Sequence, residues 1–290
     1  MSSTHDSTPQ PSALPATDST STSTSTTPDA LPLSHPTHPI TPPRPPLLRL
    51  RLDDLSTPGT TTFLRLVHAT HALTHALNTV LTHLYTSLPT SSIPATRSVT
   101  LVLRAMDGVA YTTGLSLDDD HKEIHFNTTY IEGIAPTRQK EEIMGVLVHE
   151  MVHCWQRDAC GTAPSGLIEG VADWVRLKAG LAPPHWKRRA DCKWDAGYER
   201  TAYFLEWLEG ECGKDVVRRV NERLGVGEYC EGAFWVGCCG ERVEKLWARY
   251  RRSLGCEEPG HGKDGKDGKD GEGDEGEGKG EEKEGKEGED

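Results

Sequence analysis

Two histidines and a glutamate interrupt one of the most apolar stretches of the chain, and this feature restricts the possible folds more than any other. The sequence Val-His-Glu-Met-Val-His occupies residues 148–153, and four of the five residues before it are Ile, Met, Val or Leu. On a helix, His149 and His153 are one turn apart and share a face. Two imidazoles placed in this way can bind one zinc ion, and Glu150 can face the water that the ion activates. Because buried polar side chains need a compensating partner, the stretch predicts a buried helix that carries a metal site.

A second helix is expected to supply the third zinc ligand. Glu169 lies 16 residues beyond His153, and the segment between them contains Gly161 and Pro164, which allow the chain to reverse. The two helices can then pack antiparallel, and the small Gly170 permits their close approach. We therefore predict that the two histidines and Glu169 bind Zn²⁺.

Asp173 follows Glu169 by one helical turn and is expected on the same face. There it can accept the second N–H of a ligand histidine and fix the tautomer of the ring. Two alternatives stay open: Asp173 is itself the ligand and Glu169 is spare, or both acids lie on the surface of an ordinary amphipathic helix. A third histidine is excluded as a ligand, because Ala159 occupies the position six residues after His153 where it would stand.

The two ends of the chain are poor material for a hydrophobic core. In residues 1–46, 30 of the 46 positions are Ser, Thr or Pro, and residues 257–290 are a tract of Gly, Lys, Asp and Glu. Both compositions are typical of disordered tails. Residues 47–256 remain, which is enough for one domain with a proper core.

Most of the net charge of −12 comes from the C-terminal tail, whose 15 acids and 6 lysines contribute −9. The rest of the chain carries −3 and is nearly neutral, so no nucleic-acid surface is expected. No apolar run reaches membrane-spanning length, and the N-terminus has no hydrophobic signal core. We therefore expect a monomer that is cytoplasmic by default, with secretion by a non-classical route left open.

Periodicity in residues 47–256 predicts strands first and helices later. Alternating apolar residues indicate strands at 47–52, 98–106 and 123–130. Helical patterns indicate helices at 60–85, 137–152, 166–177, 197–211, 215–224 and 242–254. This order favours a single α+β domain in which a small mixed sheet packs beside a mostly helical C-terminal half.

Several consecutive motifs resemble one known family. In chain order they are HEMVHCWQ at 149–156, GLIEGVADWVRLKAG at 166–180, PPHW at 183–186, WDAGY at 194–198 and TAYFL at 201–205. They resemble the plant basic secretory protein family, also called peptidases of plants and bacteria, over about residues 98–250. The resemblance implies a zincin-like fold and a zinc-dependent peptidase, and the plant members are secreted and linked to defence. An HExxH motif with a glutamate on the following helix is also similar to the gluzincins, which agrees with the ligands proposed above.

The expected reaction is hydrolysis of a peptide bond in a peptide or protein substrate by a zinc-activated water. Glu150 would act as the general base that takes the proton of this water. Tyr198 is the first candidate for stabilising the oxyanion and His185 is the second, although either residue can instead serve packing alone. The strand at 123–130 can offer its edge to an extended peptide.

Another class of protein would carry the same motifs. A zinc-binding defence or interaction module without peptidase turnover needs the same ligands, and a zinc hydrolase of non-peptide amides needs the same base as well. Zinc content and cleavage of a denatured protein mixture, measured together, separate these possibilities.

Overall fold

Four strands form one mixed sheet in the computed structural model, which describes residues 40–256. The strands are β1 (Leu47–Leu52), β2 (Ser98–Arg104), β3 (Ala110–Leu115) and β4 (Asp118–Asn127), in the spatial order β1-β2-β4-β3. β1, β2 and β4 run parallel, with Leu50 opposite Leu101 and Leu101 opposite Ile124, whereas β3 runs antiparallel to β4. β3 is an edge strand, and within residues 40–256 no strand pairs with its other side.

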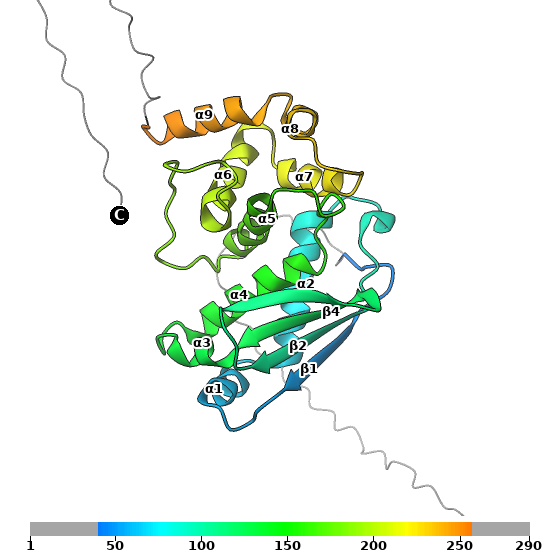
Figure 1. Cartoon of the computed structure of the whole chain (residues 1–290), viewed down its shortest axis with the longest axis vertical. Coiled ribbons are helices and arrows are strands. Elements are labelled where there is room, and N and C mark those ends of the chain that lie inside the picture. The colour runs from blue at the N-terminus through cyan, green and yellow to red at the C-terminus, as the bar shows by residue number, and fades with distance from the viewer. Residues whose placement is uncertain (1–39, 257–290) are drawn as a thin grey trace, which may run out of the picture. The chain divides into compact units, whose positions relative to one another are not determined.

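Helices make up most of the remaining described chain. They are α1 (Pro58–Leu66), α2 (Ala69–Tyr85), the short 3₁₀-helix η1 (Thr90–Ser92), α3 (Thr128–Gly133), α4 (Gln139–His153), α5 (Ser165–Lys178), α6 (Tyr198–Glu211), α7 (Val216–Leu224), α8 (Glu231–Cys239) and α9 (Val243–Ser253). In Figure 1 the sheet lies in the lower half, the helices from α5 onward lie in the upper half, and α4 runs between them.

Helices α2 and α4 pack against one face of the sheet, and the hydrophobic core lies between them. Leu101 and Leu103 of β2 lie two positions apart and therefore on the same face of the sheet, and both are fully buried in this core. Leu81 of α2 and Leu147 of α4 belong to the same buried cluster. Apolar contacts therefore hold α4 along its length. They also fix the positions of the polar residues on this helix.

The predicted α+β class, with a small mixed sheet beside a helical C-terminal half, is confirmed. The helix predicted at 60–85 is two helices, because the chain is extended at Val67 and His68. The sequence does not predict β3, whose residues Ala-Tyr-Thr-Thr-Gly-Leu lack an alternating apolar pattern, nor α8.

The prediction that the strand at 123–130 offers its edge to a peptide is wrong. This strand is β4, which pairs with β2 on one side and β3 on the other, so neither of its edges is free. It also ends earlier than predicted, because the Asn127 side chain accepts a hydrogen bond from the Thr129 N–H and begins helix α3. The free edge near α4 belongs to β3.

The predicted tails at 1–46 and 257–290 lie outside the described residues, apart from residues 40–46. The rest of the predicted domain, residues 47–256, lies inside them. No helix in this part of the chain combines the length and the apolar character that crossing a membrane requires.

Candidate metal centre and active-site cleft

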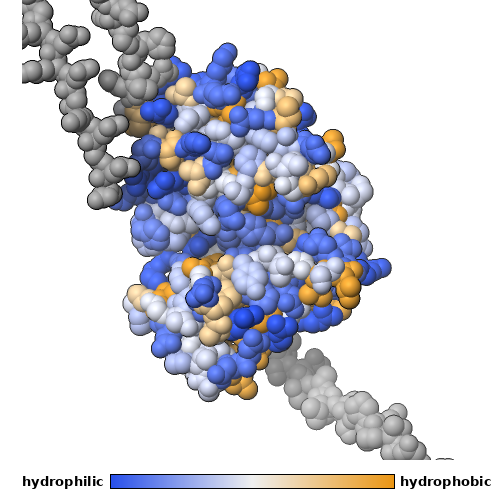
Figure 2. Space-filling view, viewed as in Figure 1, coloured by the Kyte–Doolittle hydropathy of each residue, from blue (hydrophilic) through white to orange (hydrophobic). Residues whose placement is uncertain are grey.

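A cleft of about 1310 Å³ lies along α4, and the edge strand β3, helix α5, the loop around Trp186 and the start of α6 form its other walls. In the space-filling view the surface is hollowed between the helical half and the half that carries the sheet, and hydrophilic residues line much of the hollow (Figure 2). The cleft contains all the site residues that the sequence predicts: the histidines at 149, 153 and 185, the acids at 150, 169 and 173, and Tyr198.

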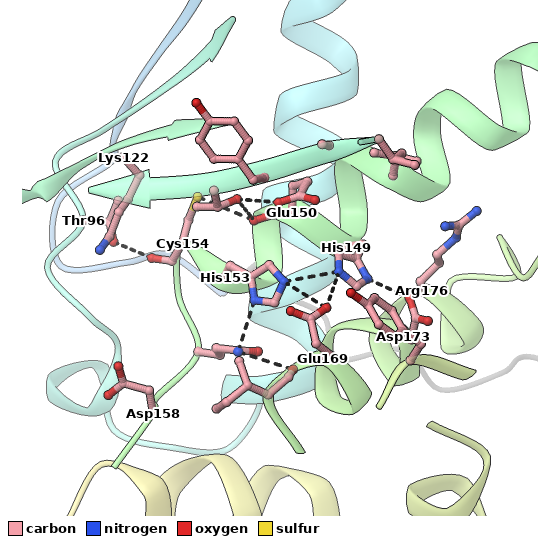
Figure 3. Close-up of a pocket in the computed structure, with 18 of the residues that line it drawn as sticks. Thr96, Lys122, His149, Glu150, His153, Cys154, Asp158, Glu169, Asp173 and Arg176 are labelled. Carbon is pink, nitrogen blue, oxygen red and sulfur yellow. Dashed lines mark hydrogen bonds and ion pairs between the residues drawn. The ribbon is translucent and has the colours of Figure 1, made fainter. Parts of the chain in front are cut away.

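Three donor atoms converge at the floor of this cleft. His149 Nε2 lies 3.2 Å from His153 Nε2 and 3.1 Å from Glu169 Oε2, and His153 Nε2 lies 3.8 Å from the same oxygen. The three side chains point toward one another from α4 and α5 (Figure 3). Among the described residues they are the one group of His, Cys, Asp and Glu side chains close enough together to hold a metal ion.

The reversal of the chain between α4 and α5 brings Glu169 to the histidines. Ala159, Cys160 and Gly161 have φ values of 56°, 58° and 78°, so three successive residues adopt the left-handed conformation. The Ala159 N–H donates to the Leu224 carbonyl at 2.9 Å, which ties this turn to the end of α7. Gly161 thus takes part in the predicted reversal, but two non-glycine residues share the left-handed turn with it.

Asp173 lies where the sequence predicts, behind His149, one of the candidate ligands. Its Oδ1 is 2.6 Å from His149 Nδ1, and both groups are buried. Burial alone would lower the pKa of His149, but the hydrogen bonds to Asp173 and Glu169 outweigh burial and raise that pKa to about 10. Burial and the charge of His149 lower the pKa of His153 to about 4. Without a metal, the protonated His149 ring therefore supplies the positive charge between the donor atoms.

The donor set fits a zinc ion. With Nδ1–H of His149 held by Asp173, its Nε2 is an acceptor that lies 3.1 Å from Glu169 Oε2, and two acceptors this close need a proton or a cation between them. A divalent cation would replace that proton, because it supplies positive charge to all three donors at once. Two imidazole nitrogens and one carboxylate oxygen are a common ligand set for catalytic zinc.

Gln156 contacts His153, the second candidate ligand, and is not among the residues that the sequence predicts for the site. Its Nε2 lies 3.2 Å from His153 Nδ1 and 3.4 Å from the Ile168 carbonyl, while its Oε1 is buried with no partner among the described residues. A histidine that binds metal through Nε2 carries its hydrogen on Nδ1 and needs an acceptor there. In the structure the amide nitrogen faces Nδ1, and turning the amide group over would place Oε1 there as the acceptor. The only signal in the sequence is its position three residues after His153.

Glu150 is buried beside β3. Thr112 Oγ1 of β3 lies 2.8 Å from Glu150 Oε2 and 3.0 Å from the Glu150 backbone oxygen. Burial raises the pKa of the Glu150 carboxyl, and the charge of His149 and the Thr112 hydrogen bond counter this only in part. The carboxylate is therefore a stronger base than an exposed one. Thr112 could not be found from the sequence, because the sequence does not predict β3.

Tyr198 covers the metal centre from the side of α6. Its ring is stacked on the His149 ring, with centroids 6.2 Å apart and an angle of 11° between the planes, and the residue is 55% exposed. The negative charge of Glu169 raises the pKa of Tyr198, so its hydroxyl stays protonated and able to donate. No hydrogen bond of this hydroxyl is found within residues 40–256.

The turn before Tyr198 is pressed against α5. Tyr198 itself has φ of +50°, an uncommon conformation for a side chain of this size. A Cβ at Gly166 would lie 1.8 Å from the Asp195 carbonyl oxygen, and one at Gly170 would lie 2.3 Å from Thr201 Cγ2. Gly166 lets the turn approach α5, and Gly170 lets α6 approach it at Thr201, so that Tyr198 lies over His149.

His185 lies on the cleft wall next to Trp186, at the end of the cleft near α3. No hydrogen bond joins it to another site residue within the described part of the chain. The structure thus brings six of the predicted residues together around one point and leaves His185 on the wall.

A family model described as "Peptidase of plants and bacteria" matches residues 45–250 of the chain. No curated protein and no solved structure matches it.

Proposed function

Because the chain belongs to the family of peptidases of plants and bacteria, we propose that it is a zinc-dependent metallopeptidase that cleaves peptide or protein substrates. His149, His153 and Glu169 would hold the zinc ion. The observation that carries the proposal is the convergence of their three donor atoms beside the buried carboxylate of Glu150. The same arrangement fits the zincin-like fold that the sequence motifs imply.

Zinc bound at this site would polarise a scissile carbonyl and lower the pKa of a water molecule to about 7. Glu150 would accept the proton of the attacking water and pass it to the leaving amine. Its burial and its contact with Thr112 support this role, since the first raises the basicity of the carboxylate and the second fixes its orientation. Asp173 would orient His149, and Gln156 would orient His153.

Tyr198 is the better of the two candidates for stabilising the oxyanion. Its protonated hydroxyl has no competing partner among the described residues, and its ring lies over His149. Tyr198 also has a positive φ, and strained backbone conformations such as this one tend to occur at functional sites. His185, on the wall toward α3, lacks a comparable contact with the ligands and suits substrate binding better.

An extended peptide suits the cleft because β3 forms one of its walls. An edge strand presents unpaired backbone N–H and C=O groups, which can hydrogen-bond to an added strand. We propose that the substrate backbone runs along β3, and not along β4 as the sequence predicts. The alternative, a zinc-binding interaction module without turnover, needs no buried base at Glu150.

One comparison tests the proposal. The full chain and its Glu150→Gln variant are purified, their zinc content is measured, and both are incubated with a denatured protein mixture. We expect one zinc per chain in both, and a loss of cleavage of about 10²–10⁴-fold in the variant, which is the usual contribution of a general base. If both proteins bind zinc and neither cleaves, the interaction module is the better interpretation. If His149→Ala binds zinc as fully as the wild type does, the assigned ligands are wrong.

A further inference from the structure

A second cavity, of about 510 Å³, adjoins the cleft near α3 and the first half of α4. We call it the side cavity. Tyr130, Glu142, Pro183 and His185 line both the cleft and the side cavity. Because the two spaces share these walls, a group attached to a ligand in the cleft can enter the side cavity.

The one acid that lines the side cavity has its charge balanced by neighbours. Glu142 Oε1 accepts a hydrogen bond from the Tyr130 hydroxyl at 3.0 Å and from Arg176 Nη2 at 2.9 Å. The Arg176 side chain is 8% exposed, so this ion pair is shielded from water. Arg138 Nη2 adds a longer contact with the other carboxylate oxygen, at 3.9 Å. A charged ligand group would have to displace these partners to pair with Glu142.

Apart from Arg138 and His185, most of the remaining wall is apolar and stiff. Ile134, Pro183 and Pro184 contribute much of it, and the proline rings hold the backbone dihedral angles of their loop. A cavity of several hundred Å³ that is mainly apolar and already formed is typical of small-molecule and side-chain binding sites. The side cavity therefore suits a large aliphatic or aromatic group.

Its distance from the metal centre can be expressed in peptide residues. Glu142 precedes His149 by seven residues on the same helix, which is about 10 Å at 1.5 Å per residue. An extended peptide covers about 3.3 Å per residue, so the side cavity lies about three residues from the scissile bond. We propose that the side cavity is a specificity subsite for a large apolar side chain, two to four positions from the bond that is cut. This inference rests on the proposed peptidase function.

Gly133 allows the side cavity to be filled without disturbing the core. It is an exposed glycine at the end of α3, and a Cβ added to it would meet no atom within 4 Å. Gly210 in α6 is its matched control, because it is also exposed, also has open space at the Cβ position, and lines neither cavity. The test uses full-length wild type, Gly133→Phe and Gly210→Phe, each loaded with zinc.

The readout is the set of cut sites in a digest of a denatured protein mixture, identified by mass spectrometry. For wild type and Gly210→Phe we expect large apolar residues to be enriched at one position two to four residues from the cut. Synthetic peptides that differ only by Leu or Ala at that position should then differ roughly tenfold or more in kcat/KM. In Gly133→Phe this ratio should fall to about one, because the phenyl ring takes the place of the substrate side chain.

A second variant covers the case in which Gly133→Phe folds poorly. Pro184 is exposed, so Pro184→Glu places a carboxylate at the side cavity at little cost to the fold. We expect it to shift the preference at the same position from apolar toward basic residues. If the wild type cleaves but shows no apolar preference there, or if both variants keep that preference, the subsite is refuted and the peptidase proposal stands. If zinc-loaded wild type cleaves nothing, the peptidase proposal fails, and the subsite fails with it.

Discussion

The two helices that carry the candidate metal ligands differ in how deeply their ligand sides are buried. On α4, the residues that flank the ligands, among them Leu147 and Val152, are completely buried in the core that faces the sheet. On α5, the Glu169 side chain is 29% exposed, and the neighbouring Tyr198 is 55% exposed. Leu167 and Ala172 of the same helix are completely buried as well, so apolar packing also holds α5, together with the close approach of Gly170 to the Thr201 side chain of α6. The candidate ligands on α4 therefore lie within the buried core, whereas the candidate ligand on α5 lies on a more exposed side, where the fit against α6 sets its position.

The largest effect on stability should come from the α4 side. Leu147→Ala removes a completely buried side chain next to His149, and we expect a loss of about 2–5 kcal/mol in the free energy of unfolding. Urea denaturation of the metal-free protein measures it. Leu64→Ala is the control, because Leu64 is 47% exposed and should lose much less. Equal losses in the two variants would contradict the view that α4 is anchored by burial.

On the α5 side, Tyr198→Phe should affect turnover and leave folding unchanged. Removing one oxyanion donor typically costs about 10²–10³-fold in kcat, and the phenyl ring can still stack on His149. We expect a loss of this order in kcat at unchanged zinc content and an unchanged urea midpoint. An unaltered kcat would leave Tyr198 with a packing role only, and His185→Ala would then be the next variant to measure.

Gly170→Ala tests whether the close fit between α5 and Thr201 of α6 holds the α5 side. The added methyl would lie 2.3 Å from Thr201 Cγ2, and overpacking of this kind costs about 1–3 kcal/mol. We also expect weaker zinc binding, because α5 must shift away from α6. Gly210→Ala is the matched control: it has open space at the same atom and should stabilise the helix by about 0.5–1 kcal/mol. If the two variants had the same stability and the same zinc affinity, the contact between Gly170 and Thr201 would not be what holds α5 in place.

The smallest of these effects should be found at Gln156, which lies on the segment between the two helices. Gln156→Leu removes the acceptor for His153 Nδ1–H and should weaken zinc binding by about 10-fold or more, as measured by competition with a chelator. Gln156→Glu keeps an acceptor but cannot donate to the Ile168 carbonyl, which Gln156 Nε2 approaches to 3.4 Å. If Glu restores the affinity, Gln156 acts through the histidine. If Glu fails as Leu does, Gln156 acts only by holding the backbone at Ile168.

Much of the metal site was predictable because it depends on local spacing. His149 and His153 share a face through the helical period, and Glu169 with Asp173 repeats the same one-turn spacing on the next helix. The fold class followed from the order of strand and helix patterns. The edge strand β3 was not predictable, because its residues do not alternate between polar and apolar. Without β3, the sequence leaves one edge of its partner β4 unpaired, and this is why β4 was predicted to be the edge strand.

By itself, the sequence determined which side chains could bind a metal and which helices would carry them, because residues four positions apart on a helix are neighbours whatever surrounds them. The tertiary structure alone decided which groups contact them: Thr112 beside Glu150, Gln156 beside His153, and the Tyr198 ring over His149. It also decided that β3, and not β4, borders the cleft. Most of these contacts join residues far apart in the chain, and all depend on strand order, turn geometry and the close approach of backbones, none of which is encoded in local periodicity.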